Sequence, residues 1–483
     1  MHNGRWLHIF CLIFFLASTA LSQPAASITQ TISASSDTLD STLTKVIVGD
    51  IILIGNNITK PSILLRELTF HKGDTITLGA INEAIVHSEE NLQNTSLFNS
   101  VRINWLQDHD KVNFYILVTE RWYIFPVPVF EIAERNFNVW WETKDFSRVI
   151  YGGILNWNNF RGRNETVAAT VRLGYIQRFS FYYNFPSISR NQKTGLTLSW
   201  AYSRNHQTAV KTIDNKIVYF KDPDNFSRKE TGGSVVLSIR PHIHVTHYFE
   251  AAYRHVSVED TVRKLNEIYL DAAAESKVTY SVLRYFLKVE HRDLAVYPSR
   301  GYYFDLELIK YGLPLFKEKV DIGYALSHIK YSIPLSKRWN IGLGLAGKYT
   351  IAGTMPYYFT KGLGYGRDFI RGYEYYVMDG AHFGLLKSNL RFTLLPKKEL
   401  HAGFIPLNKF ATIPYAFYLN LFTDAGYVKD EMTGEFNPLS NSWQHGYGAG
   451  IDFVTYYDMV FRLEYSFNKL GESGIFLHFT SSI

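Results

Sequence analysis

The chain has 483 residues, a formal net charge of +6 and an aromatic content of 16%, with 33 tyrosines and 34 phenylalanines. Its mean hydropathy is only −0.11, and beyond the N-terminus it has no apolar run of the roughly 20 residues that a membrane-spanning helix needs. These values exclude a helical membrane protein, and the scattered basic residues form no run with interleaved aromatics of the kind that binds nucleic acid.

The first residues predict an exported protein. Arg5 precedes a largely apolar stretch of about eleven residues, and small residues form a cleavage site before Gln23. We therefore expect a signal peptide over 1–22, followed by a flexible Ser/Thr-rich lead-in over 23–45. The single cysteine, Cys11, lies within this signal peptide, so we expect a mature chain without disulfides or cysteine-ligated metals. An exported chain without disulfides is more typical of a bacterial envelope than of a eukaryotic secretory product.

Residues 46–121 predict a small α+β domain. Its apolar periodicity indicates a strand, two helices and two further strands, over 46–53, 60–68, 78–92, 101–106 and 111–119. A unit of about 75 residues is large enough to bury one hydrophobic core.

From residue 122 to the C-terminus, apolar and polar residues alternate with the period of two that marks β-strands. For example, Phe461 and Leu463 alternate with Arg462 and Glu464. An aromatic-rich apolar face opposite a charged face favours lipid contact around a polar lumen. On composition alone, a soluble β-sandwich remains an alternative fold. The alternation, with about sixteen strands, predicts an all-β transmembrane barrel over 122–483 behind the N-terminal α+β domain.

Connection lengths give the barrel a direction. The longest insertions lie at 206–228, 259–277 and 352–379, and each follows an odd-numbered barrel strand. Short turns follow even-numbered strands, as on the periplasmic side of outer-membrane barrels, with 396–410 as a long exception. We therefore expect the long connections on the side opposite the N-terminal domain.

The chain offers no strong candidate for a catalytic or metal site. The glycine run over 342–347 matches G-x-G-x-x-G but lies within a predicted strand, where no helix follows to bind a nucleotide. The histidines within 242–247 lack a carboxylate at ligand spacing. We therefore expect no enzyme activity, no metal site and no cofactor.

Two motifs stand out in the predicted barrel. Arg371, Gly372 and Tyr373 lie in the longest connection, while Asp424 and Gly426 end a later strand with the sequence Phe-Thr-Asp-Ala-Gly. An arginine in a loop folded into a lumen is costly to bury unless a carboxylate pairs with it. From the residues alone, the alternative to this pair is that Arg371 is an ordinary solvated residue of the loop.

The order of these motifs resembles the bacterial surface antigen family, the BamA–TamA superfamily of outer-membrane insertases and translocases. The N-terminal domain is similar to a single POTRA module of that family, through residues 70–74, 92–101 and 118–121. Residues 159–162 and 297–302 also fit the family pattern. The resemblance therefore covers nearly the whole mature chain.

This resemblance implies that Arg371 contacts Asp424 inside the lumen and holds the sixth extracellular loop there. It also implies a lateral gate between the first and last strands, where client strands or lipids enter. The gate residues are Val127 and Val129 on the first strand, with Glu472, Gly474, Leu477 and Phe479 in a β-signal pattern on the last.

The resemblance further implies that Val101, Ile103 and Trp105 lie on a POTRA edge strand, which binds extended clients by strand addition. The expected partners are unfolded outer-membrane or secreted polypeptides, outer-membrane lipid and periplasmic accessory proteins. We expect polypeptide insertion or translocation at the outer membrane of a Gram-negative bacterium, with the POTRA domain in the periplasm. A dedicated secretion channel, or a structural or lipid-handling barrel without protein clients, is the alternative.

Overall fold

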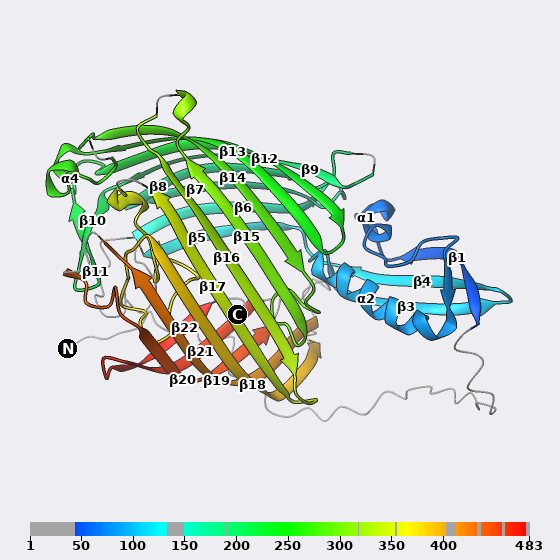
Figure 1. Cartoon of the computed structure of the whole chain (residues 1–483). Coiled ribbons are helices and arrows are strands. Elements are labelled where there is room, and N and C mark those ends of the chain that lie inside the picture. The colour runs from blue at the N-terminus through cyan, green and yellow to red at the C-terminus, as the bar shows by residue number, and fades with distance from the viewer. Residues whose placement is uncertain are drawn as a thin grey trace, which may run out of the picture.

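A computed structural model of the chain has two parts, a small α+β domain and a large β-barrel (Figure 1). The described residues are 44–132, 149–189, 191–271, 273–316, 318–352, 355–401, 412–431, 436–455 and 459–479. The predicted signal peptide and nearly all of the lead-in lie outside these ranges. In the described part of the chain, no helix is long and apolar enough to cross a membrane.

The N-terminal domain combines a four-stranded sheet with two α-helices. Its elements are β1 (Lys45–Ile54), α1 (Pro61–Leu65), β2 (Thr75–Thr77), η2 (Leu78–Ala80), α2 (Ile81–Asn94), β3 (Phe98–Asp108) and β4 (Lys111–Glu120). The strand order is β2-β1-β4-β3, and β1 runs parallel to β4. Leu64 of α1, Ile81 and Leu92 of α2 and Phe114 of β4 are fully buried in one core.

Sixteen antiparallel strands form the barrel sheet, as predicted. They are β5 (Ile124–Ile132), β6 (Val149–Phe160), β7 (Glu165–Gly174), β8 (Ile176–Phe185), β9 (Thr194–Asn205), β12 (Arg228–His242), β13 (Val245–Val258), β14 (Lys277–Glu290), β15 (Gly301–Tyr311), β16 (Ile322–Pro334), β17 (Trp339–Ala352), β18 (His382–His401), β19 (Thr412–Lys429), β20 (Gln444–Thr455), β21 (Met459–Asn468) and β22 (Ser473–Phe479). Each pairs with the next in the chain, and β9 pairs directly with β12.

The barrel wall is apolar outside and polar inside. On β21, the outward Leu463 and Tyr465 are 50% and 46% exposed, whereas the inward Arg462 and Glu464 are only 4% and 1% exposed. A soluble sandwich would bury the apolar positions and expose the charged ones. The reversed arrangement is that of a wall whose outer face contacts lipid.

The N-terminal domain lies against one end of the barrel, which we call the proximal rim (Figure 1). The backbone N–H of Lys60 donates to the carbonyl of Gly162 in the β6–β7 turn, at 2.8 Å. Arg240, near the end of β12, donates two hydrogen bonds to the carboxylate of Glu67, at 2.7 and 2.8 Å. Asn94 of α2 donates to a carbonyl of the β14–β15 turn. The domain therefore contacts three separate turns of the same rim.

The longest connections lie at the opposite end, the distal rim, as predicted (Figure 1). They join β9 to β12, β13 to β14 and β17 to β18. All three contain secondary structure that the sequence did not predict, and the β17–β18 connection holds the 3-10 helix η5 (Tyr357–Phe359). The first holds a hairpin of β10 (Gln207–Ile213) and β11 (Lys216–Lys221), and the second holds the short helix α4 (Asp260–Leu265).

One predicted connection is partly strand. The stretch 396–410 was expected to be a long proximal turn, but β18 continues to His401 and its partner β19 begins at Thr412. Register shifts near Leu395 keep the extended strands paired. The expectation was wrong here because bulges interrupt the alternation that marks a strand in the sequence.

Candidate functional site

The loop between β17 and β18 folds into the lumen, and its Arg371 is only 1% exposed. The guanidinium forms a bidentate pair with Asp424 of β19, with Nε–Oδ2 at 2.8 Å and Nη2–Oδ1 at 2.5 Å. The Asn389 and Glu464 side chains and the Ser388 carbonyl accept its remaining hydrogen bonds. Each guanidinium donor thus has an acceptor, which is what a buried arginine requires. We call this cluster the latch.

Two further contacts hold Arg371 in place. Its guanidinium carbon lies 3.9 Å from the centroid of the Phe422 ring, a cation–π contact. Its backbone N–H donates to Asp424 Oδ2 at 3.1 Å. Phe422 and Asp424 are two residues apart on β19, so both side chains face the lumen.

Glycines allow the loop and the wall to approach closely. Gly372 has a φ of +89°, and a Cβ there would lie 2.9 Å from the Phe467 carbonyl oxygen. At Gly446 of β20, a Cβ would lie 1.8 Å from the carbonyl oxygen of Arg371. At Gly426 it would lie 2.6 Å from a side-chain carbon of the loop. Any larger residue at these positions would displace the loop.

The residue after the glycine anchors the loop to β20 and β21. Tyr373 donates its hydroxyl hydrogen to Gln444 Oε1 at 2.9 Å and accepts from the backbone N–H of Lys469 at 3.2 Å. Asn468 Nδ2 donates to the carbonyl of Gly372 at 2.9 Å. Arg371, Gly372 and Tyr373 therefore each bond to a different part of the wall.

The same loop contacts the last strand. Glu374 Oε1 lies 3.3 Å from Nε2 of His478 on β22. The Tyr376 hydroxyl donates to Oε1 of Glu472, immediately before β22, at 2.8 Å. The ring of Phe369 lies 5.4 Å from that of His478. The loop thus links the interior of the lumen to one edge of the barrel sheet.

The two ends of the sheet order are β5 and β22, which form the seam of the barrel. Within Ile124–Ile132 and Ser473–Phe479 no ladder joins them, whereas each consecutive pair along the sheet is laddered. Pro126 and Pro128 pair with β6, and prolines in a sheet turn their nitrogens toward an unpaired edge. This edge of β5 therefore lacks two backbone donors.

Two comparisons with known proteins bear on these features. Residues 159–468 match the Omp85 superfamily domain, and residues 46–121 match a POTRA domain, the surface antigen variable number repeat. The chain belongs to the Omp85 superfamily. A comparison with curated protein sequences gives no significant match.

Solved structures share the fold of this Omp85 protein. BamA from Haemophilus ducreyi lacking POTRA domains 1–3 is 15% identical with a TM-score of 0.50, covering 90% of this chain and 84% of that one. CdiB from Escherichia coli is 11% identical with a TM-score of 0.53, covering 90% of this chain and 76% of that one. At these sequence identities, both structures are similar to this chain in fold only.

The predicted client-binding residues lie on β3, which is an outer strand of the POTRA sheet. Val101 and Ile103 pack on the domain core, while Trp105 is 38% exposed. One edge donor already has a partner, because the backbone N–H of Ile103 donates to Oε1 of Glu89 on α2 at 2.7 Å. A strand added to this edge would therefore compete with Glu89.

The predicted gate residues lie on both sides of the seam. On β5, Val127 is 45% exposed and Val129 is buried. On β22, Leu477 and Phe479 alternate with the lumenal His478, and Phe479 is 64% exposed. The other two predicted gate residues also lie at this edge, Glu472 just before β22 and Gly474 opposite Ser466 of β21.

Sequence reasoning missed several wall residues around the latched loop, namely Asn389, Glu464, His478 and Gly446. Glu464 carried a usable signal, since it lies on the charged face of an alternating strand. The others belong to strands or turns whose distance from the loop cannot be read from spacing along the chain.

Proposed function

We propose that this Omp85 protein inserts polypeptides into the outer membrane of a Gram-negative bacterium or translocates them across it. The POTRA domain and the proximal rim would lie in the periplasm, and the distal rim would face outward. The observation that carries the proposal is the seam, where the described parts of β5 and β22 share no ladder. An unpaired strand edge is a template for another chain.

The seam would act as a lateral gate. A client strand that pairs with the free edge of β5 or β22 satisfies backbone groups that lipid cannot satisfy. Such exchange needs no cofactor, because hydrogen bonds within the growing sheet supply the driving force. The POTRA strand β3 would present extended clients near the proximal rim by strand addition.

The latch would confine opening to the seam. Arg371 bonds to Ser388 and Asn389 of β18, Asp424 of β19 and Glu464 of β21. It thereby joins the C-terminal strands into one rigid unit from inside. Among strands that are neighbours around the described barrel, only β5 and β22 have no ladder between them, and the hydrogen bonds of Arg371 do not join them.

A reversible crosslink tests the gate. Cysteines at Val127 or Val129 would be combined with cysteines at Leu477 or Phe479 and oxidised in liposomes that contain the full chain. Insertion of an unfolded reporter barrel should stop on oxidation and return on reduction. A crosslink between two laddered residues, Leu155 of β6 and Ala169 of β7, is the matched control and should leave insertion unchanged. Insertion through a verified seam crosslink would contradict the gate.

Depletion in cells followed by outer-membrane proteomics identifies the client class. Loss of many barrels supports an insertase, and loss of one exported protein supports a dedicated secretion channel. Unchanged outer-membrane and secreted proteins with altered lipid distribution would contradict the proposal and favour a lipid-handling barrel.

A further inference from the structure

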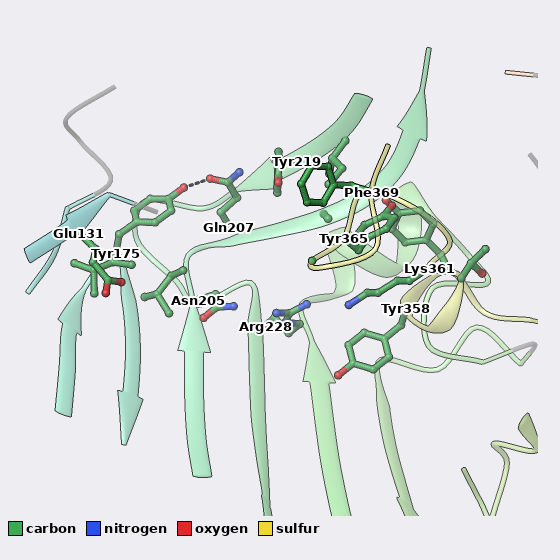
Figure 2. A pocket seen from close by; sticks show the side chains of 18 of the residues that line it. Glu131, Tyr175, Asn205, Gln207, Tyr219, Arg228, Tyr358, Lys361, Tyr365 and Phe369 are labelled. Carbon is green, nitrogen blue, oxygen red and sulfur yellow. Dashed lines mark hydrogen bonds between the residues drawn. The ribbon is translucent and has the colours of Figure 1, made fainter. Parts of the chain in front are cut away.

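A cavity of about 570 Å³ lies in the lumen near the distal rim, beside the latched loop (Figure 2). Its wall combines residues of β5, β6, β7, β8, β9, β12 and β22 with β10, β11 and the β17–β18 loop. The volume is within the usual range for small-molecule sites. The cavity borders the seam and the latched loop, since Glu131 of β5, His478 of β22 and Tyr373 of the loop all line it.

The cavity wall carries three strong cations, Arg172, Arg228 and Lys361. Arg172 donates to Glu131 at 3.2 Å, and Arg228 Nε lies 3.4 Å from a carboxylate oxygen of Glu230. Lys361 is exposed to the cavity, and its ammonium has no hydrogen bond or ion pair among the residues that the structure describes. The wall therefore holds a cation that is available to a ligand.

The cations converge. Figure 2 shows the ends of the Arg228 and Lys361 side chains pointing toward one another, with Tyr358 beside them. Arg228 Cζ and Lys361 Nζ both lie 5.9 Å from the centroid of the Tyr358 ring. Lys361 Nζ is also 5.9 Å from the ring of Tyr365. Glu230 acts on both positive charges and Asp379 acts on Lys361. Lys361 makes no ion pair with either carboxylate in the described part of the chain, so its ammonium can still attract an anion.

The rest of the wall is aromatic and hydrogen-bonding. The rings of Tyr219, Tyr358 and Tyr365 supply flat apolar faces with a hydroxyl at one end. Gln207 supplies an amide whose oxygen already accepts from the Tyr175 hydroxyl and whose nitrogen can donate to a ligand, while the Asn205 amide bonds to Arg204 and Arg228. A sugar ring has the complementary chemistry, because its C–H faces stack on aromatic rings and its hydroxyls bond to amides.

We propose that this cavity binds an acidic saccharide, with its carboxylate or phosphate between Arg228 and Lys361 and its ring against Tyr358 or Tyr365. The cavity has room for one or two sugar rings, and in the orientation proposed above, on which this inference rests, the distal rim faces molecules outside the cell. The sugar could belong to an outer-leaflet glycolipid or to a free saccharide, and both carry the same recognised groups.

Calorimetric titration of the detergent-solubilised full chain tests this site. Digalacturonate should bind, and its methyl ester, which keeps the rings and removes the charge, should bind at least tenfold more weakly. Lys361→Met and Arg228→Gln should each weaken digalacturonate binding at least tenfold, while Lys361→Arg retains it. Lys211→Met on β10 is the matched control, since Lys211 is exposed and does not line the cavity.

Three results would overturn the proposal. These are no digalacturonate binding at millimolar concentration, equal binding of the ester, or unchanged binding by a folded Lys361→Met variant. The comparison of acid and ester uses the unmodified chain, so it does not depend on the folding of any variant.

Further probes identify the source of the sugar. Vesicles that contain a glycolipid with a phosphorylated disaccharide headgroup should compete with digalacturonate if the ligand is lipid-borne. Binding of digalacturonate without such competition assigns the site to a free saccharide. Tighter binding of a tetraglutamate peptide than of digalacturonate would contradict the saccharide assignment.

Discussion

Two bidentate arginine–carboxylate pairs attach separate parts of this Omp85 protein to its barrel, and they differ in burial. In the latch, the side chains of Arg371 and Asp424 are 1% and 0% exposed. In the contact between POTRA domain and barrel, those of Arg240 and Glu67 are 29% and 2% exposed. The hydrogen-bond lengths are similar, at 2.5–2.8 Å and 2.7–2.8 Å.

Similar distances do not imply similar strength. Water reaches Arg240 and screens its charge, so the loss of this pair exposes a group that can be rehydrated. Removal of one latch partner leaves the other charge in a closed lumen without compensation. We infer that the latch is a permanent internal brace, whereas the POTRA contact is reversible.

The largest expected effect is loss of the latch. Arg371→Ala and Asp424→Ala should each weaken attachment of the loop by about 3–5 kcal/mol, because each leaves a buried charge unpaired. The double variant should be little worse than either single one. Arg371→Lys should restore little of this attachment, because an ammonium cannot reproduce the planar, two-pronged hydrogen bonding of a guanidinium. Protease accessibility of the loop in intact cells is the measurement.

The control for this experiment is Arg367→Ala in the same loop, since the Arg367 side chain is 56% exposed and its ion pair with Asp305 of β15 is 3.8 Å long, so water can replace it. It should leave the loop protected. If Arg371→Ala and Asp424→Ala also leave the loop protected and the barrel active, the latch has no mechanical role.

A second test displaces the loop without changing any charge. Gly446→Ala places a methyl group where the Arg371 carbonyl oxygen lies, at 1.8 Å, and should cost about 1–3 kcal/mol of loop attachment. Gly384→Ala on β18 is the matched control, because a Cβ there meets nothing within 4 Å. Equal protease protection of the loop in both variants would show that close approach at β20 is unnecessary.

The POTRA contact should respond to pH. Burial raises the pKa of Glu67, but hydrogen bonds and charge from Arg240 across the contact, together with those from Arg66 in the same domain, outweigh it and bring the pKa below the ordinary value of 4.5. A lowered carboxyl pKa stabilises the docked state above that value, and this contribution is lost as pH falls through the lower docked-state pKa. Distances between spin labels on the POTRA domain and the barrel should therefore lengthen only below about pH 4.5.

Glu67→Gln should remove the pH response and weaken docking by roughly 1–2 kcal/mol, less than the latch variants lose. Glu90, which pairs with Arg300 of the same rim, is the comparison. Because the Arg300 side chain is 51% exposed, Glu90→Gln should change the distances little. Equal effects of the two variants would contradict the argument from burial.

The smallest expected effect concerns the POTRA edge. Glu89→Ala frees the Ile103 N–H for a client strand and should raise photo-crosslinking of an extended peptide to β3 about twofold. Glu83→Ala on the same helix is the control, because the Glu83 side chain is 78% exposed and lies 3.8 Å from His87, on the same helix. Reduced crosslinking in the Glu89→Ala variant would indicate that the client peptide binds at a site other than the β3 edge.

The sequence by itself determined the strand count, the N-terminal α+β domain and the side on which the long connections lie. These features depend on local patterns, because the alternation of a strand repeats every two residues wherever its partner lies. It also singled out Arg371 and Asp424, since a buried loop arginine needs a carboxylate. The hairpin β10–β11 escaped prediction because the long insertion was interpreted as a loop.

Only the tertiary structure decided what surrounds the latch. Glu464 lies 93 residues from Arg371 along the chain, yet barrel curvature brings the inner face of β21 to the loop. The requirement for glycine at 446 also depends on tertiary structure. A side chain there would clash with the backbone of Arg371, which belongs to a loop from another part of the chain. The acceptor for Ile103 and the cavity at the distal rim also depend on packing between separate elements. Curvature of the barrel sheet sets these distances, and no spacing along the chain encodes them.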